Sequence, residues 1–190
     1  MKKAVEYLKR GEVRKKSLFR EVFSWVLYLL LILVITFLFV HFVGQKTRVN
    51  GMSMYPTLSD GDNLIVDKLT YQFSDPKRFD IIVFPFRYQE DTYYVKRIVG
   101  LPGETVQIMN GILYINGAAI SDDYGNAPME KSGLASEPVT LGEDEYFVLG
   151  DNRNDSSDSR EPSVGNISKE SIIGKVRLRI WPLSGFGLVN

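Results

Sequence analysis

The chain has 190 residues, with 23 Lys and Arg balanced by 23 Asp and Glu, no Cys and a single His. That length fits one medium domain with an appendage and excludes a large multidomain assembly. The lack of Cys excludes a disulfide scaffold, a thiol nucleophile and a Cys-ligated metal. The single His, His41, lies in an apolar run, which excludes a Ser-His-Asp triad and a multi-His zinc site. Any chemistry must therefore use Ser, Thr, Lys, Tyr or carboxylates.

The balanced net charge hides a strong asymmetry along the chain. Residues 1–21 form a basic tail with eight Lys or Arg against three Glu, so residues 22–190 carry the compensating net charge of −5. An acidic body argues against nucleic-acid binding. Val22 to Val43 contains no charged residue, and as a helix it would span ~33 Å, the thickness of a bilayer core. The basic flank predicts that the N-terminus is cytoplasmic and that residues 44–190 lie outside.

Two other interpretations of this apolar segment are less consistent with the sequence. A cleavable signal peptide has a shorter apolar core and a small-x-small cleavage site, whereas here GQKTRVN follows a long core. A buried helix of a globular domain is rarely apolar on all faces over six turns. We therefore expect a permanent single-pass anchor in the cell membrane, with lipid around it and His41 near its outer interface.

Residues 44–190 have the pattern of an antiparallel, mainly β domain. Short runs rich in Val, Ile, Tyr and Phe alternate with Gly, Pro, Asn and Asp, as in LIVDKL, FDIIVFPF, TYYVKRIVG, ETVQIM, ILYING, EYFVLG and IIGKVRLRIWPL. Asn110-Gly111 predicts a two-residue hairpin turn, because a type I′ turn needs positive φ at both central residues. The polar segment from about Ala118 to Glu143 is predicted to be a loop excursion or small subdomain outside the core.

Three segments carry candidate chemistry, and each has a plainer alternative. GMSMYPTL places Ser53 between two Met close to the membrane, although a Ser in a turn is usually only a turn former. In YYVKRIVGLPGE, adjacent Lys96 and Arg97 point to opposite faces of a strand, so one faces inward unless the strand is a charged edge. GDNRNDSSDSR resembles a calcium loop, but Arg153 and Ser156 occupy positions that an EF-hand gives to a ligand and to Gly.

Together, in this order behind one anchor, these motifs resemble the type I signal peptidases of bacteria. GMSMYPTL is similar to the nucleophile box of that family, RFDIIVF to its strand box, YVKRIVGLPGE to its lysine box and GDNRNDSSDSR to its final box. The resemblance runs from the anchor to about Arg160, with a weaker match at GKVRLRIWP. It implies an antiparallel β catalytic domain with a small β insertion, at about residues 110–145, in the Gram-positive-type branch with a single anchor.

The resemblance also implies roles for individual residues. Ser53 is expected to be the nucleophile and Lys96 the general base, with Ser156 hydrogen-bonding the lysine amine and an Asp158–Arg160 ion pair bracing the site. A nearby Asp would hold the lysine charged, so we expect Asp158 to pair with Arg160 rather than with Lys96. No metal or organic cofactor is required.

The implied reaction removes signal peptides from exported preproteins after small-x-small sites such as Ala-x-Ala. The resemblance assigns Met54, Val83, Tyr94 and Val95 to shallow pockets for the small residues. Ser53 would attack the carbonyl, and neutral Lys96 would accept its proton and later protonate the leaving amine. That role requires a lowered lysine pKa, which burial among apolar groups can supply.

Two departures from the family pattern stand out. Gly51 replaces a Ser that supplies an oxyanion-hole hydroxyl in some members, which leaves the Ser53 backbone N–H as the assigned donor. Phe79 replaces the Gly of the usual Arg-Gly-Asp in the strand box, which we expect to alter packing rather than chemistry. A decoy pair, Ser74 and Lys77, matches Ser-x-x-Lys, but Pro76 breaks the helix that this motif needs.

Two other functions compete with the peptidase hypothesis. A self-cleaving Ser/Lys regulator would carry a DNA-binding domain, for which a tail of 21 residues leaves no room. A membrane-anchored β domain that binds partners without catalysis would keep its function when Ser53 or Lys96 is removed.

Overall fold

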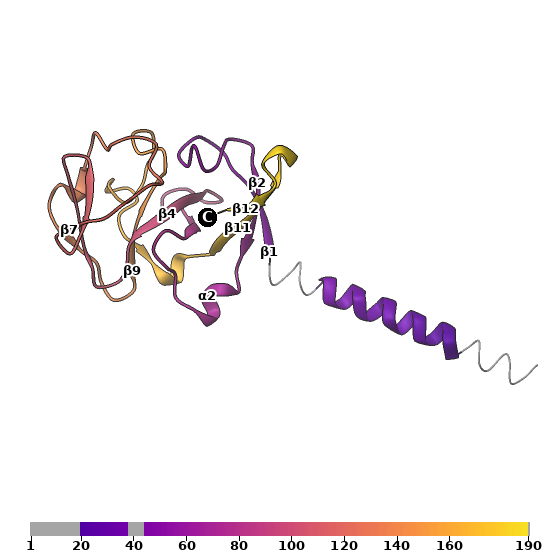
Figure 1. Cartoon of the computed structure of the whole chain (residues 1–190). Coiled ribbons are helices and arrows are strands. Elements are labelled where there is room, and N and C mark those ends of the chain that lie inside the picture. The colour runs from indigo at the N-terminus through magenta and orange to yellow at the C-terminus, as the bar shows by residue number, and fades with distance from the viewer. Residues whose placement is uncertain (1–19, 38–43, 190) are drawn as a thin grey trace, which may run out of the picture. The chain divides into compact units, whose positions relative to one another are not determined.

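The structure, a computed structural model, describes residues 20–37 and 44–189 (Figure 1). Contacts between residues divide the chain into two compact units, residues 1–42 and residues 43–190. In the first unit, Arg20–Phe37 is an apolar helix of 18 residues with exposed side chains, long and apolar enough to cross a membrane. The predicted anchor continues to Val43, and its last residues, with His41, lie outside the described part of the chain.

The second unit is built on a large sheet of eight strands. Its strands are β1 (Gly44–Arg48), β2 (Asn63–Asp67), β3 (Ile81–Pro85), β4 (Tyr93–Gly100), β9 (Glu145–Leu149), β10 (Ile167–Ser168), β11 (Gly174–Trp181) and β12 (Gly187–Leu188). The order is β1-β2-β11-β3-β4-β9-β10, with β12 paired to β11, and every pairing is antiparallel. β3 and β4 are therefore interior strands, which explains why IIVF of β3 is buried on both faces.

A second, smaller antiparallel sheet has the order β7-β6-β5-β8. Its strands are β5 (Thr105–Met109), β6 (Ile112–Ile115), β7 (Ala118–Ala119) and β8 (Val139–Thr140). Asn110 and Gly111 have φ of 52° and 77°, so the predicted hairpin turn is confirmed. Asn116 and Gly117 repeat this geometry between β6 and β7, a second turn that the sequence analysis did not identify.

The polar excursion at residues 118–143 contributes to the core, contrary to the sequence-based expectation. Met129, Ala135 and Leu141 are buried with the small-sheet residues, against Phe147 and Leu149 of β9. The small sheet also begins at Thr105, one strand earlier than the expected insertion at about residues 110–145, because β5 is the hairpin partner of β6. Figure 1 shows β7 and its neighbours beside β9.

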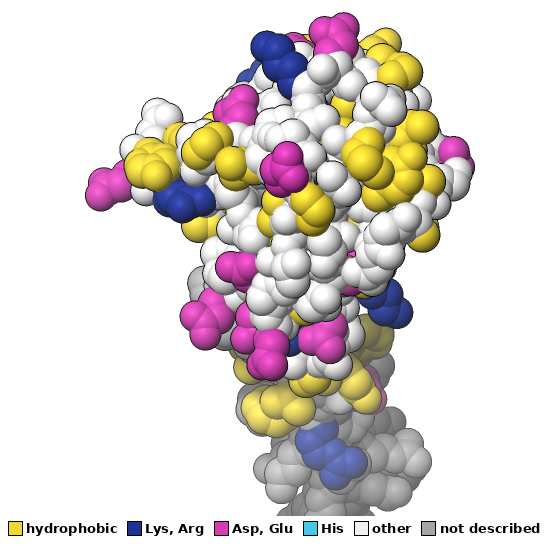
Figure 2. Space-filling model, turned by 90° about the vertical axis from the view of Figure 1, so that its left-hand side faces the viewer, with side chains coloured by type: hydrophobic (Ala, Val, Ile, Leu, Met, Phe, Trp, Pro, Cys, Tyr) yellow, Lys and Arg dark blue, Asp and Glu magenta, His cyan; other side chains and the backbone are white. Residues whose placement is uncertain are grey.

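Short helices connect the strands: α2 (Thr70–Phe73), η2 (Gly133–Ser136), η3 (Lys169–Ser171) and η4 (Leu183–Gly185). The two faces of the large sheet bury separate apolar clusters, and alternate residues of β2 such as Leu64 and Val66 point into one of them. Figure 2 shows more acidic than basic side chains on the face of the domain that it draws, in keeping with the net charge outside the basic tail. The prediction of a mainly antiparallel β domain behind one apolar helix is confirmed.

Candidate active site

Ser53 lies in a compact turn between β1 and β2. Backbone hydrogen bonds from Val49 N to Asp62 O and from Gly61 N to Val49 O close the ends of this segment. Inside it, Met54 and Leu58 are 1% and 0% exposed and anchor the turn in the apolar cluster below β2. The chain on both sides of Ser53 is therefore fixed, and its hydroxyl is presented from a rigid loop. We call residues 49–62 the serine loop.

Lys96 reaches this loop from the middle of β4. Its Nζ donates a hydrogen bond of 2.7 Å to Ser53 Oγ and one of 3.1 Å to the Val95 carbonyl. The lysine is 3% exposed, and because β4 runs between β3 and β9, the alternative of a charged edge strand is excluded. The predicted dyad is thus brought together from residues 43 positions apart.

Burial determines the acid–base behaviour of Lys96. Desolvation lowers the pKa of its ammonium from 10.5 to about 8, because the charged form loses its hydration inside the protein. The carboxylates of Asp158, Asp151 and Glu161 oppose this by raising the pKa. Desolvation dominates since two of these carboxylates are engaged elsewhere, Asp158 with Arg160 and Asp151 with Arg97.

The expected Asp158–Arg160 ion pair is formed, and it braces the loop that follows β9. Arg160 Nε and Nη2 donate to the two carboxylate oxygens at 2.8 Å each. Asp158 also accepts the Gly150 N–H at 3.0 Å, and Arg160 donates to the Arg153 carbonyl at 2.6 Å. The pair therefore fixes residues 150–160 against the end of β9.

Ser156 lies beside the serine loop, but the hydrogen bond to the lysine amine expected from the resemblance is not made here. Its Oγ is buried and has no hydrogen-bond partner among the described residues. A Cβ built on Gly150 would lie 2.2 Å from Ser156 Oγ and 2.4 Å from the Ser53 carbonyl oxygen. Gly150 is therefore the spacer that lets the serine loop and the Ser156 segment approach each other.

A second polar cluster, which the sequence motifs did not predict, holds the serine loop from below. Arg97, fully buried next to Lys96, donates from Nε and Nη2 to Asp151 at 2.9 and 2.8 Å. Thr57 Oγ1 donates to the same carboxylate at 2.5 Å, and Asn152 N donates to the Ser53 carbonyl at 3.0 Å. Lys96 and Arg97 are thus both buried, each for a different purpose. The available signal was Asp151 in the final box, because a buried Arg requires a carboxylate partner.

A groove of ≈590 Å³ contains the dyad and runs between residues 47–54 and residues 91–96. Met54, Tyr94 and Val95 line it, as the resemblance implies. Val83 does not: it is 2% exposed and pairs with Val95 across β3 and β4, beneath the groove. The Ser53 N–H makes no hydrogen bond to any residue that the structure describes.

The two departures from the family pattern both lie at positive φ. Gly51 has φ of 95° and donates its N–H to Asp60 at 2.8 Å, so this residue orients the loop entrance. Phe79 has φ of 69°, a conformation that costs an L residue energy and that Gly adopts freely. Its ring lies 5.0 Å from that of Tyr124, which in turn covers the Arg97 guanidinium at 3.7 Å. Phe79 therefore acts through packing, as expected.

Comparisons with known proteins show which family the chain is similar to. A family model described as signal peptidase, peptidase S26, matches residues 22–181. Signal peptidase I P of Bacillus subtilis subsp. natto is 36% identical over 179 residues, covering 90% of this chain and 94% of that protein. Signal peptidase I of Bacillus caldolyticus is 42% identical over 156 residues, covering 76% and 84%. A crystal structure of a signal peptidase I from Enterococcus faecalis is 38% identical, with a TM-score of 0.46, covering 54% of this chain and 97% of that one.

Proposed function

Because the chain belongs to the signal peptidase S26 family, we propose that Ser53 and Lys96 are the dyad with which it removes signal peptides from exported proteins. The activity is that of signal peptidase I, a serine endopeptidase. The 2.7 Å contact between Lys96 Nζ and Ser53 Oγ is the observation that carries the assignment. The Ser53 N–H beside it makes no hydrogen bond to a described residue and suits an oxyanion donor.

The proposed reaction follows from the ionisation of Lys96. With a pKa of about 8, a substantial fraction of the amine is neutral at mildly alkaline pH. The neutral amine takes the Ser53 proton as Oγ attacks the scissile carbonyl, and the resulting ammonium protonates the leaving amine as the C–N bond breaks. Water then attacks the acyl carbon while Lys96 accepts one of its protons, and the ammonium returns this proton to Ser53 Oγ as the ester C–O bond breaks, which regenerates both residues.

We further propose that the groove binds the signal peptide as an extended strand, with small residues before the cleaved bond. Met54, Tyr94 and Val95 narrow the groove beside Ser53, and main-chain pairing of an extended peptide supplies affinity that does not depend on sequence. Val83 would act indirectly, by supporting Val95 from below.

The topology that suits this activity has the N-terminus in the cytoplasm and residues 44–190 outside, next to membrane lipid. The basic tail of residues 1–21 supports that orientation through the positive-inside bias. The protein is a membrane protein with one N-terminal apolar helix. Support of the dyad by the Asp158–Arg160 pair is part of the same proposal.

The deciding experiment is cleavage of a model secretory precursor by the detergent-solubilised full chain. Ser53→Ala and Lys96→Ala should each abolish the mature product while remaining folded. The matched controls are Ser74→Ala and Lys77→Ala, exposed residues of the decoy pair, which should cleave like the wild type. Equal processing by Ser53→Ala and wild type would place the catalytic site elsewhere. A wild-type rate that falls below pH 8 would report titration of Lys96.

A further inference from the structure

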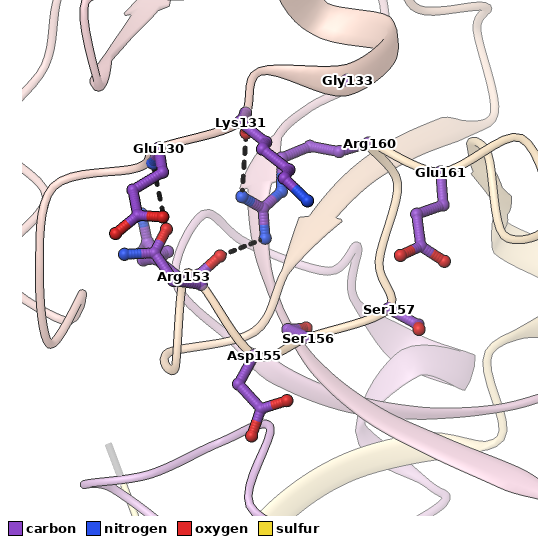
Figure 3. A pocket seen from close by; sticks show the side chains of 10 residues that line it. Glu130, Lys131, Gly133, Arg153, Asp155, Ser156, Ser157, Arg160 and Glu161 are labelled. Atoms are coloured by element: carbon purple, nitrogen blue, oxygen red, sulfur yellow. Dashed lines mark hydrogen bonds between the residues drawn. The ribbon is translucent and has the colours of Figure 1, made fainter.

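A second cavity, of ≈380 Å³, is lined by residues from the segments 130–133 and 153–161 (Figure 3). Asp155 and Ser157 line both this cavity and the groove that contains Ser53 and Lys96. The segment 155–157 therefore borders both spaces, and the cavity is adjacent to the groove. We call this second space the acidic cavity; its lining includes Glu130, Lys131, Asp155, Ser156, Ser157 and Glu161.

Two observations place the acidic cavity near the atoms from which the amine product would leave. Ser156 lines the cavity, and its Oγ lies against the same face of Gly150 as the Ser53 carbonyl oxygen. Glu161, another lining residue, is close enough to Lys96 for its carboxylate to raise the lysine pKa. Lys96 is the group that protonates the leaving amine, so this amine forms next to the cavity.

The charges of the cavity do not cancel. Arg153 and Arg160 also line it, but each is paired with a carboxylate outside the lining, Asp122 and Asp158. Of the remaining lining residues, Glu130, Asp155 and Glu161 have no ion-pair partner among the described residues, against the single cation Lys131. The cavity therefore has an excess of negative charge.

We propose that the acidic cavity binds the first residues of the mature protein, on the leaving side of the cleaved bond, and favours positive charge there. This inference rests on the proposed roles of Ser53 and Lys96. The groove holds the acyl part of the substrate, and the cavity holds the amine part until it is released. Its carboxylates attract the new α-ammonium and any Lys or Arg side chain within about four residues of the cut.

The test uses precursors identical except for one residue at positions one to four of the mature part, occupied in turn by Lys, Gln or Glu. Wild-type kcat/KM should be higher for Lys than for Glu at one or more of these positions, by about 3- to 10-fold, as expected for one partly solvated charge pair. Raising the salt concentration to about 1 M should bring the ratio toward one.

Variants that remove a negative charge and a variant that removes a positive charge should have opposite effects. Glu161→Gln and Asp155→Asn should each lower the Lys-to-Glu ratio, whereas Lys131→Gln should raise it. Glu143→Gln, an exposed carboxylate outside the cavity, is the matched control and should leave the ratio unchanged.

Two results would overturn the inference. One is a wild-type ratio of kcat/KM for the Lys and Glu precursors that is close to one at all four positions. The other is that each variant changes the cleavage of the Lys, Gln and Glu precursors by the same factor. Failure of the dyad assignment looks different, because then Ser53→Ala would still cleave the Gln substrate. A ratio that responds to Lys131→Gln alone would also contradict the role given to the carboxylates.

Discussion

The catalytic role proposed for Lys96 and its cost for folding have the same cause, the burial of its side chain. The native state must remove its side chain from water, which lowers the pKa from 10.5 to about 8. In the unfolded chain the same lysine regains its ordinary pKa, so between these values the unfolded state binds more protons than the native state. Stability should therefore rise with pH through this window, and the cost of the buried ammonium is fully present below about pH 8.

Lys96→Met should be inactive and more stable at pH 7. Removing the buried charge should raise the free energy of unfolding by about 2 kcal/mol, the penalty of the pKa shift less the lost hydrogen bond to Ser53. At pH 10.5 most of the gain should disappear, because the lysine is then neutral in the native state and half neutral in the unfolded chain. Urea unfolding of both proteins at pH 7 and 10.5 measures this. Lys77→Met, at an exposed lysine, should change stability by only a few tenths of a kcal/mol; an equal gain there would contradict the explanation.

Gly150→Ala should lose activity out of proportion to its effect on stability. The added methyl group would lie 2.2 Å from Ser156 Oγ and 2.4 Å from the Ser53 carbonyl oxygen, so the serine loop must move. A shift of this size at the nucleophile should lower kcat by about 100-fold or more. The control is Gly142→Ala, which precedes β9 as Gly150 follows it. A Cβ at Gly142 would lie 3.4 Å from its nearest neighbours, which are side-chain atoms of Glu145. Comparable kcat values for the two variants would argue against Gly150 as a spacer.

At the residue scale, the sequence motifs singled out Ser53 and Lys96, which the structure brings together, and the Asp158–Arg160 pair, but they did not predict the Arg97–Asp151 pair. Ser53 and Lys96 stand in distinctive motifs, and the apolar neighbours of each anticipated burial. The Arg97–Asp151 pair joins residues 54 positions apart and depends on the pairing of β4 with β9 and on the loop that follows β9. Those long-range contacts are properties of the fold, which a local pattern does not encode.

At the scale of single elements, β11 connects the C-terminal segment to the serine loop through Arg179. Its Nη1 donates to Asp62 at 3.0 Å and to the Thr57 carbonyl at 3.3 Å, while its Nε donates to the Gly185 carbonyl at 2.6 Å. Arg177, on the same strand, instead contacts Asp67 and Thr70. The two arginines thus form a natural pair for comparison.

Arg179→Gln should lower kcat by about tenfold with little change in KM, because the serine loop loses an anchor while the groove stays in place. Arg177→Gln, which removes a partly exposed ion pair, should leave both constants near wild type. Arg179→Lys should restore part of kcat by keeping the charge next to Asp62. Steady-state cleavage of one peptide by the three variants decides this; a change confined to KM would assign Arg179 to substrate binding instead.

Turn chemistry explains which elements were predictable. Asn110-Gly111 was identified because it separates two clear strands, whereas Asn116-Gly117 precedes a strand of only two residues, Ala118–Ala119. The buried Met129, Ala135 and Leu141 were missed because they are isolated apolar residues in a polar segment with no periodicity. Their burial comes from packing against β5, β6 and β9.

For the whole molecule, the described contacts separate residues 1–42 from the β domain. The dyad, its supporting ion pairs and the groove all belong to residues 44–189. Chemistry should therefore be a property of the β domain, and the apolar helix should act by confining the enzyme to the surface that holds its substrate. Confinement raises the effective concentration without adding a contact.

Deletion of residues 1–43 should therefore affect cleavage of a soluble peptide and cleavage of a membrane-embedded precursor differently. The shortened protein should cleave a short soluble peptide with a kcat/KM within about threefold of the full chain, because the groove is intact. For a precursor embedded in lipid vesicles the rate should fall by about 100-fold, since enzyme and substrate no longer share a surface. Replacing residues 22–43 with an unrelated apolar helix of equal length should restore the vesicle reaction. If the shortened protein stays folded and yet fails on the soluble peptide, the helix must contribute to the site itself, and the division of roles argued here would be wrong.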